Sequence, residues 1–225
     1  MVFSVIFEEK HNSEHWSTYV AGAKILRPIS ESIPGHIDHI LYRSLTREGW
    51  NLSLSSWANE KALVRWRTTK EHCKYQDMGR NKLLVDYHLR VGLNVQDSHG
   101  AAAAGSLEQT EVGDATMILL HDIVKSPDWV KEKTPENIAN SLGLRQQQLG
   151  LVQWDVFDEV LQPGHVLLLS CWKDQSATLA FEGEYNWENG VRLRTVQIVR
   201  DYGMFDRREA PQYYPDVVGR TTLHH

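Results

Sequence analysis

The segment Leu-Ser-Leu-Ser-Ser-Trp at residues 52–57 has a counterpart in Leu-Leu-Leu-Ser-Cys-Trp at residues 167–172. The tryptophans that end these segments, Trp57 and Trp172, are 115 positions apart. The same offset holds, without a gap, for further pairs: Gly35 with Gly150, Gly49 with Gly164, Leu54 with Leu169, Ala62 with Ala177, and Asp86-Tyr87 with Asp201-Tyr202. Solenoid repeats have periods of roughly 20–50 residues, so this longer period indicates a duplicated domain.

Composition excludes several classes of protein. The 225 residues include 24 Lys and Arg against 29 Asp and Glu, a net charge of −5, so the chain has no basic footprint for nucleic acid or for an anionic membrane. No run approaches the roughly 18–20 apolar residues of a membrane helix, and MVFSVIFEEK lacks the basic start of a signal peptide. Cys73 and Cys171 have no CxxC spacing, and we expect free thiols in a soluble, cytoplasmic protein.

Both halves predict the same order of elements. In the first half, apolar periodicity and turn residues predict strands over 2–8, 36–45, 50–57 and 83–91, and helices over 13–32 and 60–76. In the second half they predict strands over 117–124, 151–160, 165–172 and 193–202, and helices over 126–142 and 175–188. The order β-α-β-β-α-β is the ferredoxin-like pattern.

The fold class that follows is α+β, with two tandem ferredoxin-like domains. We expect the first domain at 1–95, a linker of small and polar residues at 96–113, and a second domain with a C-terminal tail at 114–225. Each four-stranded sheet would carry both helices on one face and leave the other uncovered. Packing the sheets against each other would close this exposure in a barrel-like pair, with the natural pocket in the interior between them.

One set of residues resembles a known family. Ser55-Ser56-Trp57-Ala58-Asn59-Glu60, followed by Ala62, Trp66, Glu71-His72, Gly79-Arg80 and Asp86-Tyr87, is similar to antibiotic biosynthesis monooxygenase (ABM) domains of the dimeric α/β-barrel superfamily. The likeness covers most of the first half and is weaker in the second. It implies cofactor-free monooxygenases acting on polyketide-type aromatics, haem-degrading enzymes, or chlorite-dismutase-like haem proteins with two domains per chain. Two fused copies would mimic the dimer of single-domain relatives.

The predicted helix 60–76 carries the first candidate site. Ala62, Trp66 and Cys73 fall on one side, and Thr69, His72 and Gln76 form a polar stripe along its flank. We expect His72 to act as the acid/base group with Gln76 orienting it, and Trp66 and Thr69 to contact the substrate. The alternative is a surface histidine paired with Glu71 or Asp77.

The second half does not repeat this stripe. Its matching residues are Phe181, Glu184, Trp187 and Val191, so we expect a single active cavity, in the first half. Trp57 is a further candidate for substrate contact, although its repetition as Trp172 favours a role in packing.

His36-Ile37-Asp38-His39 is the second candidate site. On a regular strand His36 and Asp38 share one face and His39 takes the other, so only two of them could enter one site. A metal site needs three or four ligands, and we therefore expect no metal and assign His39 to the substrate pocket. Asp86, His88 and Arg90 would form a solvent-facing row on the last strand of the first half.

Haem gives a direct comparison with the family. In its haem-degrading members a haem-binding histidine follows the tryptophan by ten residues, but Gln76 and Val191 stand ten residues after Trp66 and Phe181. The leading prediction is therefore an ABM-like monooxygenase acting, without a cofactor, on a hydrophobic, aromatic small molecule. A haem-binding protein and a non-catalytic small-molecule binder remain alternatives. An internal pair needs no second chain, yet its exposed outer helices would allow a homodimer.

Overall fold

The computed structural model describes residues 1–100, 107–145, 147–184 and 190–212. The first half contains β1 (Phe3–His11), η1 (Ser13–His15), α1 (Trp16–Glu31), β2 (His36–Ser44), β3 (Trp50–Trp57), α2 (Glu60–Arg67), α3 (Lys70–Met78), η2 (Gly79–Leu83) and β4 (Leu84–Asp97). The second half contains β5 (Met117–Val124), α4 (Pro127–Lys131), α5 (Pro135–Ser141), β6 (Leu151–Glu159), β7 (His165–Trp172), α6 (Gln175–Glu184) and β8 (Arg192–Gly203).

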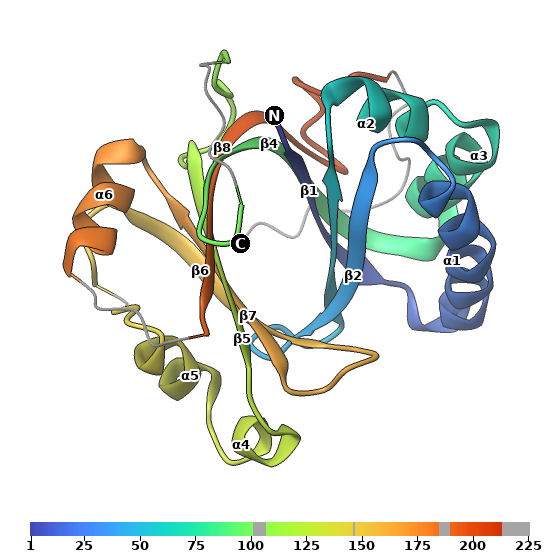
Figure 1. Ribbon diagram of the computed structural model, residues 1–225. Helices are drawn as coiled ribbons and strands as arrows, with labels where there is room; N and C mark the ends of the chain where they lie inside the picture. The colour runs from blue at the N-terminus through green and yellow to red at the C-terminus, as the bar shows by residue number, and fades with distance from the viewer. Residues whose placement is uncertain (101–106, 146, 185–189, 213–225) are drawn as a thin grey trace.

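The eight strands form one closed antiparallel barrel in the order β1-β3-β2-β6-β7-β5-β8-β4. Each half supplies four neighbouring strands, and the halves join where β2 pairs with β6 and β4 pairs with β8. The halves therefore meet edge to edge, rather than as two separate sheets packed face to face, and closure leaves none of these eight strands at an open edge. The helices lie outside the barrel, with α1–α3 against the first half and α4–α6 against the second (Figure 1).

Within the ranges that the structure describes, side chains fill the interior of the barrel, where we expected a pocket between the sheets. Apolar side chains from both halves pack there, among them Ile6, Leu54, Leu120, Phe157 and Leu169, all 1% exposed or less. These residues point inward because they alternate with outward-facing neighbours along their strands.

Buried ion pairs accompany this apolar core. Arg90 pairs with Glu8, and Arg194 donates to Asp122 at 2.7 Å. Arg90 is 1% exposed, so the prediction of a solvent-facing row at Asp86, His88 and Arg90 was wrong. Its partner Glu8 lies on the neighbouring strand β1, a pairing across the sheet that the pattern of one strand does not reveal.

Two predicted helices are each divided. The helix expected over 60–76 breaks at Thr68 and Thr69, whose hydroxyls donate to carbonyls of the preceding turn. The helix expected over 126–142 becomes α4 and α5, since Thr134 caps a new helix that begins at Pro135.

Other boundaries differ less. β4 extends to Asp97, two residues into the expected linker at 96–113, and α6 reaches Glu184, while 185–189 lie outside the described residues. Cys73 and Cys171 are free thiols. The longest helix of the described ranges, α1, has 16 residues, and none there is long and apolar enough to cross a membrane.

Candidate active site

A cavity of about 290 Å³ lies between the outer face of the first half-barrel and helices α1–α3. The strand residues that line it alternate along β1 and β3: Phe3, Val5, Phe7, Glu9, Ser53, Ser55 and Trp57. In the second half Leu168 replaces Ser53 and is fully buried in a core with Leu119, Ile138 and Phe181. The small side chain of Ser53 thus leaves space that a leucine fills in the second half.

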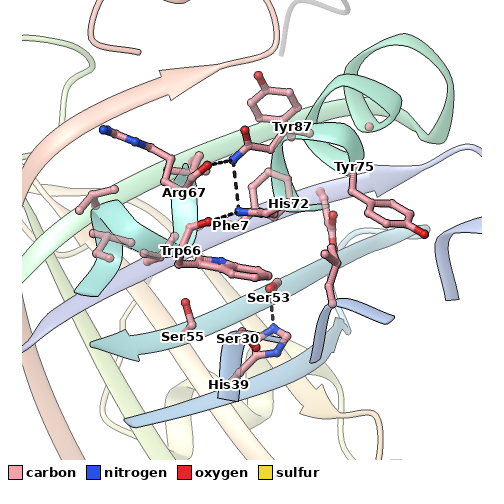
Figure 2. A pocket seen from close by; sticks show the side chains of 18 of the residues that line it. Phe7, Ser30, His39, Ser53, Ser55, Trp66, Arg67, His72, Tyr75 and Tyr87 are labelled. Carbon is pink, nitrogen blue, oxygen red and sulfur yellow. Dashed lines mark hydrogen bonds between the residues drawn. The ribbon is translucent and has the colours of Figure 1, made fainter. Parts of the chain in front are cut away.

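His72 lies in this cavity, on α3, and not on the exposed surface (Figure 2). Its imidazole is stacked on the indole of Trp66, with centroids 3.9 Å apart and planes 13° from parallel. Nδ1 lies 3.1 Å from the carbonyl oxygen of Trp66. Because that oxygen can only accept, Nδ1 carries the hydrogen and Nε2 carries the lone pair.

Burial fixes the charge state of this histidine. It lowers the pKa of His72 from 6.5 to about 4, while the hydrogen bond to Trp66 acts in the opposite direction. The imidazole is therefore neutral at pH 7. A neutral imidazole with an available Nε2 can accept a proton from a bound molecule.

Gln76 lies beside His72, one turn further along α3. Its Nε2 donates to the carbonyl oxygen of Arg67 at 3.3 Å and lies 3.4 Å from Nδ1 of His72 (Figure 2). Since Nδ1 carries its hydrogen toward Trp66, the second contact is one of packing and not a hydrogen bond. The prediction that these two side chains meet is confirmed by their geometry. Thr69, by contrast, does not line the cavity: its hydroxyl donates to the carbonyl oxygen of Arg65 at 2.8 Å, because the helix breaks at this residue.

Two further predicted residues line the cavity. Trp57 is fully buried, and its Nε1 donates to Ser55 at 3.0 Å, as Trp172 does to Ser170 at 2.9 Å. This repetition shows a shared structural role, although the ring also lies 6.3 Å from that of Trp66. His39 borders the cavity and contacts the hydroxyl of Ser53 at 2.8 Å.

His36 and His39 both face the cavity, which contradicts the regular alternation we expected. The pairing of β2 with β3 shifts register between His36 and Asp38, and Ile37 is the extra residue of this bulge. The bulge brings His36 and His39 to one side and turns Asp38 to the other. Among the described residues no group of three or more His, Cys, Asp or Glu side chains has metal-binding geometry.

A second titratable group, Glu9, was missed in the sequence. It is 1% exposed, lines the cavity and accepts a hydrogen bond of 2.5 Å from the hydroxyl of Tyr19 on α1. Burial raises the pKa of Glu9 from 4.5 to about 8, so at pH 7 it is mainly protonated. The signal was a carboxyl group in phase with Phe3, Val5 and Phe7 on one strand face.

We compared the sequence with those of known protein families and known proteins. The sequence profile described as "Antibiotic biosynthesis monooxygenase" matches residues 2–78, which carry His72, Gln76, Trp66 and Trp57. A protein of Pyricularia oryzae named "Jasmonate monooxygenase ABM" is 39% identical over 219 residues, covering 95% of this chain and 99% of that protein.

The chain belongs to the antibiotic biosynthesis monooxygenase family.

Membership in the ABM family makes the chain an enzyme of the oxidoreductase type. Among solved structures, an aldoxime dehydratase in complex with butyraldoxime matches 88% of this chain and 79% of its own, with a TM-score of 0.51 and 9% identity, a likeness of fold alone. Rv0793 from Mycobacterium tuberculosis matches 44% of this chain and 99% of its own, with a TM-score of 0.40 and 16% identity. The family profile ends at residue 78, so it covers the part of the cavity formed by β1–β3 and α1–α3, but not the part formed by η2, β4 and β8.

Proposed function

We propose that this ABM-family enzyme is a cofactor-independent monooxygenase that acts on a hydrophobic small molecule in the cavity under α1–α3. The observation that carries the proposal is the neutral His72, stacked on Trp66 and with the lone pair of its imidazole at Nε2, in a cavity that several apolar and aromatic side chains line. Here His72 is the acid/base group, Gln76 fixes its orientation, and Trp66 and Trp57 form apolar walls.

The chemistry requires a substrate that can itself reduce oxygen. Nε2 of His72 would take a proton from an activated CH₂ group or from a phenol, and the carbanion or phenolate would react with O₂. For a CH₂ group, one oxygen atom enters the product as a carbonyl, the other leaves as water, and all the electrons come from the substrate. The anion beside the imidazole would raise the pKa of His72 above its value in the empty cavity and so support the transfer.

The relative from Pyricularia oryzae supplies the first compound to test. It is named for jasmonate, a ketone with enolisable positions, an apolar tail and a carboxylate. A ligand of this kind fits an apolar cavity bordered by a few polar groups.

Oxygen uptake with jasmonic acid tests the proposal. Replacing His72 by alanine should lower the rate by about 10²-fold or more, the usual contribution of a positioned acid/base group. Glu71→Ala, one residue away on α3 and exposed, is the matched control and should retain full activity. Undiminished turnover by the His72 variant would refute the role of His72 as the acid/base group. A haem absorption band corresponding to one haem per chain would refute the proposal that the enzyme needs no cofactor.

A further inference from the structure

Positive charge is concentrated in the cavity although the chain as a whole is acidic. The cavity lining includes five arginines (Arg27, Arg67, Arg80, Arg200 and Arg207) but only two carboxyl groups, whereas the net charge of the chain is −5. Arg27 is balanced outside the cavity by Glu31, at 2.8 Å. The other four arginines come from α2, η2, β8 and the segment that follows β8.

The two carboxyl groups do little to offset these arginines. Glu9 is mainly protonated at pH 7, since burial raises its pKa to about 8. Glu60 is exposed and lies in the first turn of α2, whereas Arg67 ends that helix. The interior of the cavity therefore favours an anion.

The arginines gather around two phenols. Nη1 of Arg80 and Nη1 of Arg207 donate to the hydroxyl oxygen of Tyr87 at 2.9 and 2.6 Å. The guanidinium of Arg207 also lies 5.3 Å above the ring of Tyr202. Burial raises the pKa of Tyr202 to about 12, and the positive charges of Arg207, Arg67 and Arg200 act against this rise.

Two donors at this end of the cavity remain available. Nε of Arg67 is buried and has no hydrogen-bond partner within the ranges that the structure describes. The hydroxyl oxygen of Tyr87 accepts from two guanidinium groups, which leaves its own hydrogen to donate, and no acceptor for it occurs in the same ranges. Buried donors without an acceptor are costly, so they point to a ligand.

We propose that this arginine end of the cavity binds a carboxylate carried by an apolar substrate, with Arg67, Arg207 and the hydroxyl of Tyr87 as its donors. The carbonyl of Arg67 accepts from Gln76, and Gln76 contacts His72, so the arginine end of the cavity adjoins the candidate acid/base group (Figure 2). With its carboxylate bound at this end, a substrate would place its apolar body over Trp66 and His72. A planar guanidinium matches a carboxylate in shape as well as in charge. The inference rests on the proposed function in taking this cavity as the substrate site.

Binding without oxygen tests the subsite apart from turnover. Two pairs of probes differ only in the charge at one end: jasmonic acid with methyl jasmonate, and 1-naphthaleneacetic acid with its methyl ester. Quenching of tryptophan fluorescence under nitrogen gives Kd for each. We expect at least one acid to bind the unmodified protein about tenfold or more tightly than its ester.

Arg67→Met should weaken binding of the acid about tenfold and leave the ester within about twofold, and Tyr87→Phe should act in the same direction with a smaller effect. Arg65→Met, an exposed arginine on the same helix that does not line the cavity, should change neither. Circular dichroism establishes whether each variant is folded. If Arg67→Met does not fold, Tyr87→Phe alone tests the subsite.

Three results would overturn the subsite: equal affinity for acid and ester, equal weakening of both by Arg67→Met, or no binding of either acid. Failure of the monooxygenase proposal gives a different result. A preference for the acid that Arg67→Met abolishes, with no oxygen uptake on any acid, would retain the subsite and reject the oxygenase.

Discussion

The side chain and the main chain of Trp66 each hold one part of His72. The indole lies parallel to the imidazole at 3.9 Å between centroids, and the carbonyl oxygen of the same residue accepts from Nδ1 at 3.1 Å. The indole excludes water from one ring face, and the carbonyl sets the tautomer. Because only one of these contacts belongs to the side chain, substitution of Trp66 separates shielding from orientation.

Trp66→Leu should raise the pKa of His72 from about 4 toward 6.5, since water would reach the ring while the backbone contact remains. The measurement is an NMR titration of the His72 ring, assigned by its loss in His72→Ala. Trp129→Leu, in α4 of the second half, is the control and should leave the pKa of His72 unchanged. A His72 pKa that stays near 4 in Trp66→Leu would show that the rest of the cavity, and not the indole, excludes water.

Glu9 gives a prediction for stability as a function of pH. Burial raises its pKa from 4.5 to about 8, so the folded chain retains a proton that the unfolded chain releases. The extra proton held by the folded chain stabilises it; this contribution is fully present below pH 4.5 and is lost as the pH rises through 8. Glu9→Gln keeps a neutral acceptor for Tyr19. Relative to the unmodified protein, its free energy of unfolding should increase by a few kcal/mol between pH 5 and pH 8, so the difference in Tm should rise steadily over that range.

The comparison at each pH separates Glu9 from the buried histidines. His11 and His72 have depressed pKa values, and the stability that they contribute is lost as the pH falls from 6.5 toward 4, opposite to the effect of Glu9. The unmodified protein and Glu9→Gln share this contribution, so it cancels in the difference between them. Glu48→Gln, on an exposed turn, should give a difference in Tm that does not vary with pH. A similarly flat difference for Glu9→Gln would show that Glu9 is ionised in the folded chain.

The repeat was enough to predict the order of elements, because both halves carry the same turns and strand ends. The strands predicted at 117–124 and 165–172 match β5 and β7 residue for residue. The side on which the cavity lies could not be predicted. Whether a sheet face is filled depends on the size of side chains brought together from several strands, such as Ser53 against Leu168, and not on the periodicity of any one strand.

Local irregularity limited the prediction of the site. The bulge at Ile37 places His36 and His39 on one side, and no glycine or proline at that position marks it. The break at Thr68 and Thr69 removed Thr69 from the predicted stripe, because its hydroxyl bonds to the backbone of α2. His72 and Gln76 still meet, since both lie within the uninterrupted helix α3.

The buried pair of Glu8 and Arg90 makes a strong prediction for stability. Both residues are 1% exposed inside the barrel. Arg90→Met should lower the free energy of unfolding by about 3 kcal/mol in urea, because the buried carboxylate of Glu8 would keep only its ion pair with the partly exposed Arg47. Arg27→Met removes the exposed pair with Glu31 and should cost about 1 kcal/mol or less. If Glu8→Gln in the Arg90→Met background restores none of the loss, then packing and not charge explains it.

The glycines of the repeat allow both halves to be tested together. Gly35 and Gly150 have φ of +98° and +82°, and an added Cβ would lie 2.8 Å from Cβ of Ala62 and 2.5 Å from Cβ of Ala177. These four residues are two pairs of the 115-residue offset, so the same glycine-to-helix contact occurs in each half. Gly35→Ala and Gly150→Ala should each cost about 2–4 kcal/mol, from a left-handed backbone together with the clash.

Gly49→Ala isolates the backbone contribution, since Gly49 has φ of +78° and, beyond its own chain neighbours, no atom of the described residues lies within 4 Å of an added Cβ. It should cost only about 1–2 kcal/mol in the same urea titration. Because the two halves close one barrel through β2–β6 and β4–β8, loss of either glycine-to-helix contact should shift a single unfolding transition. Two separate transitions after Gly150→Ala, with the first half still folded, would mean that the half with the cavity does not depend on the second for its stability.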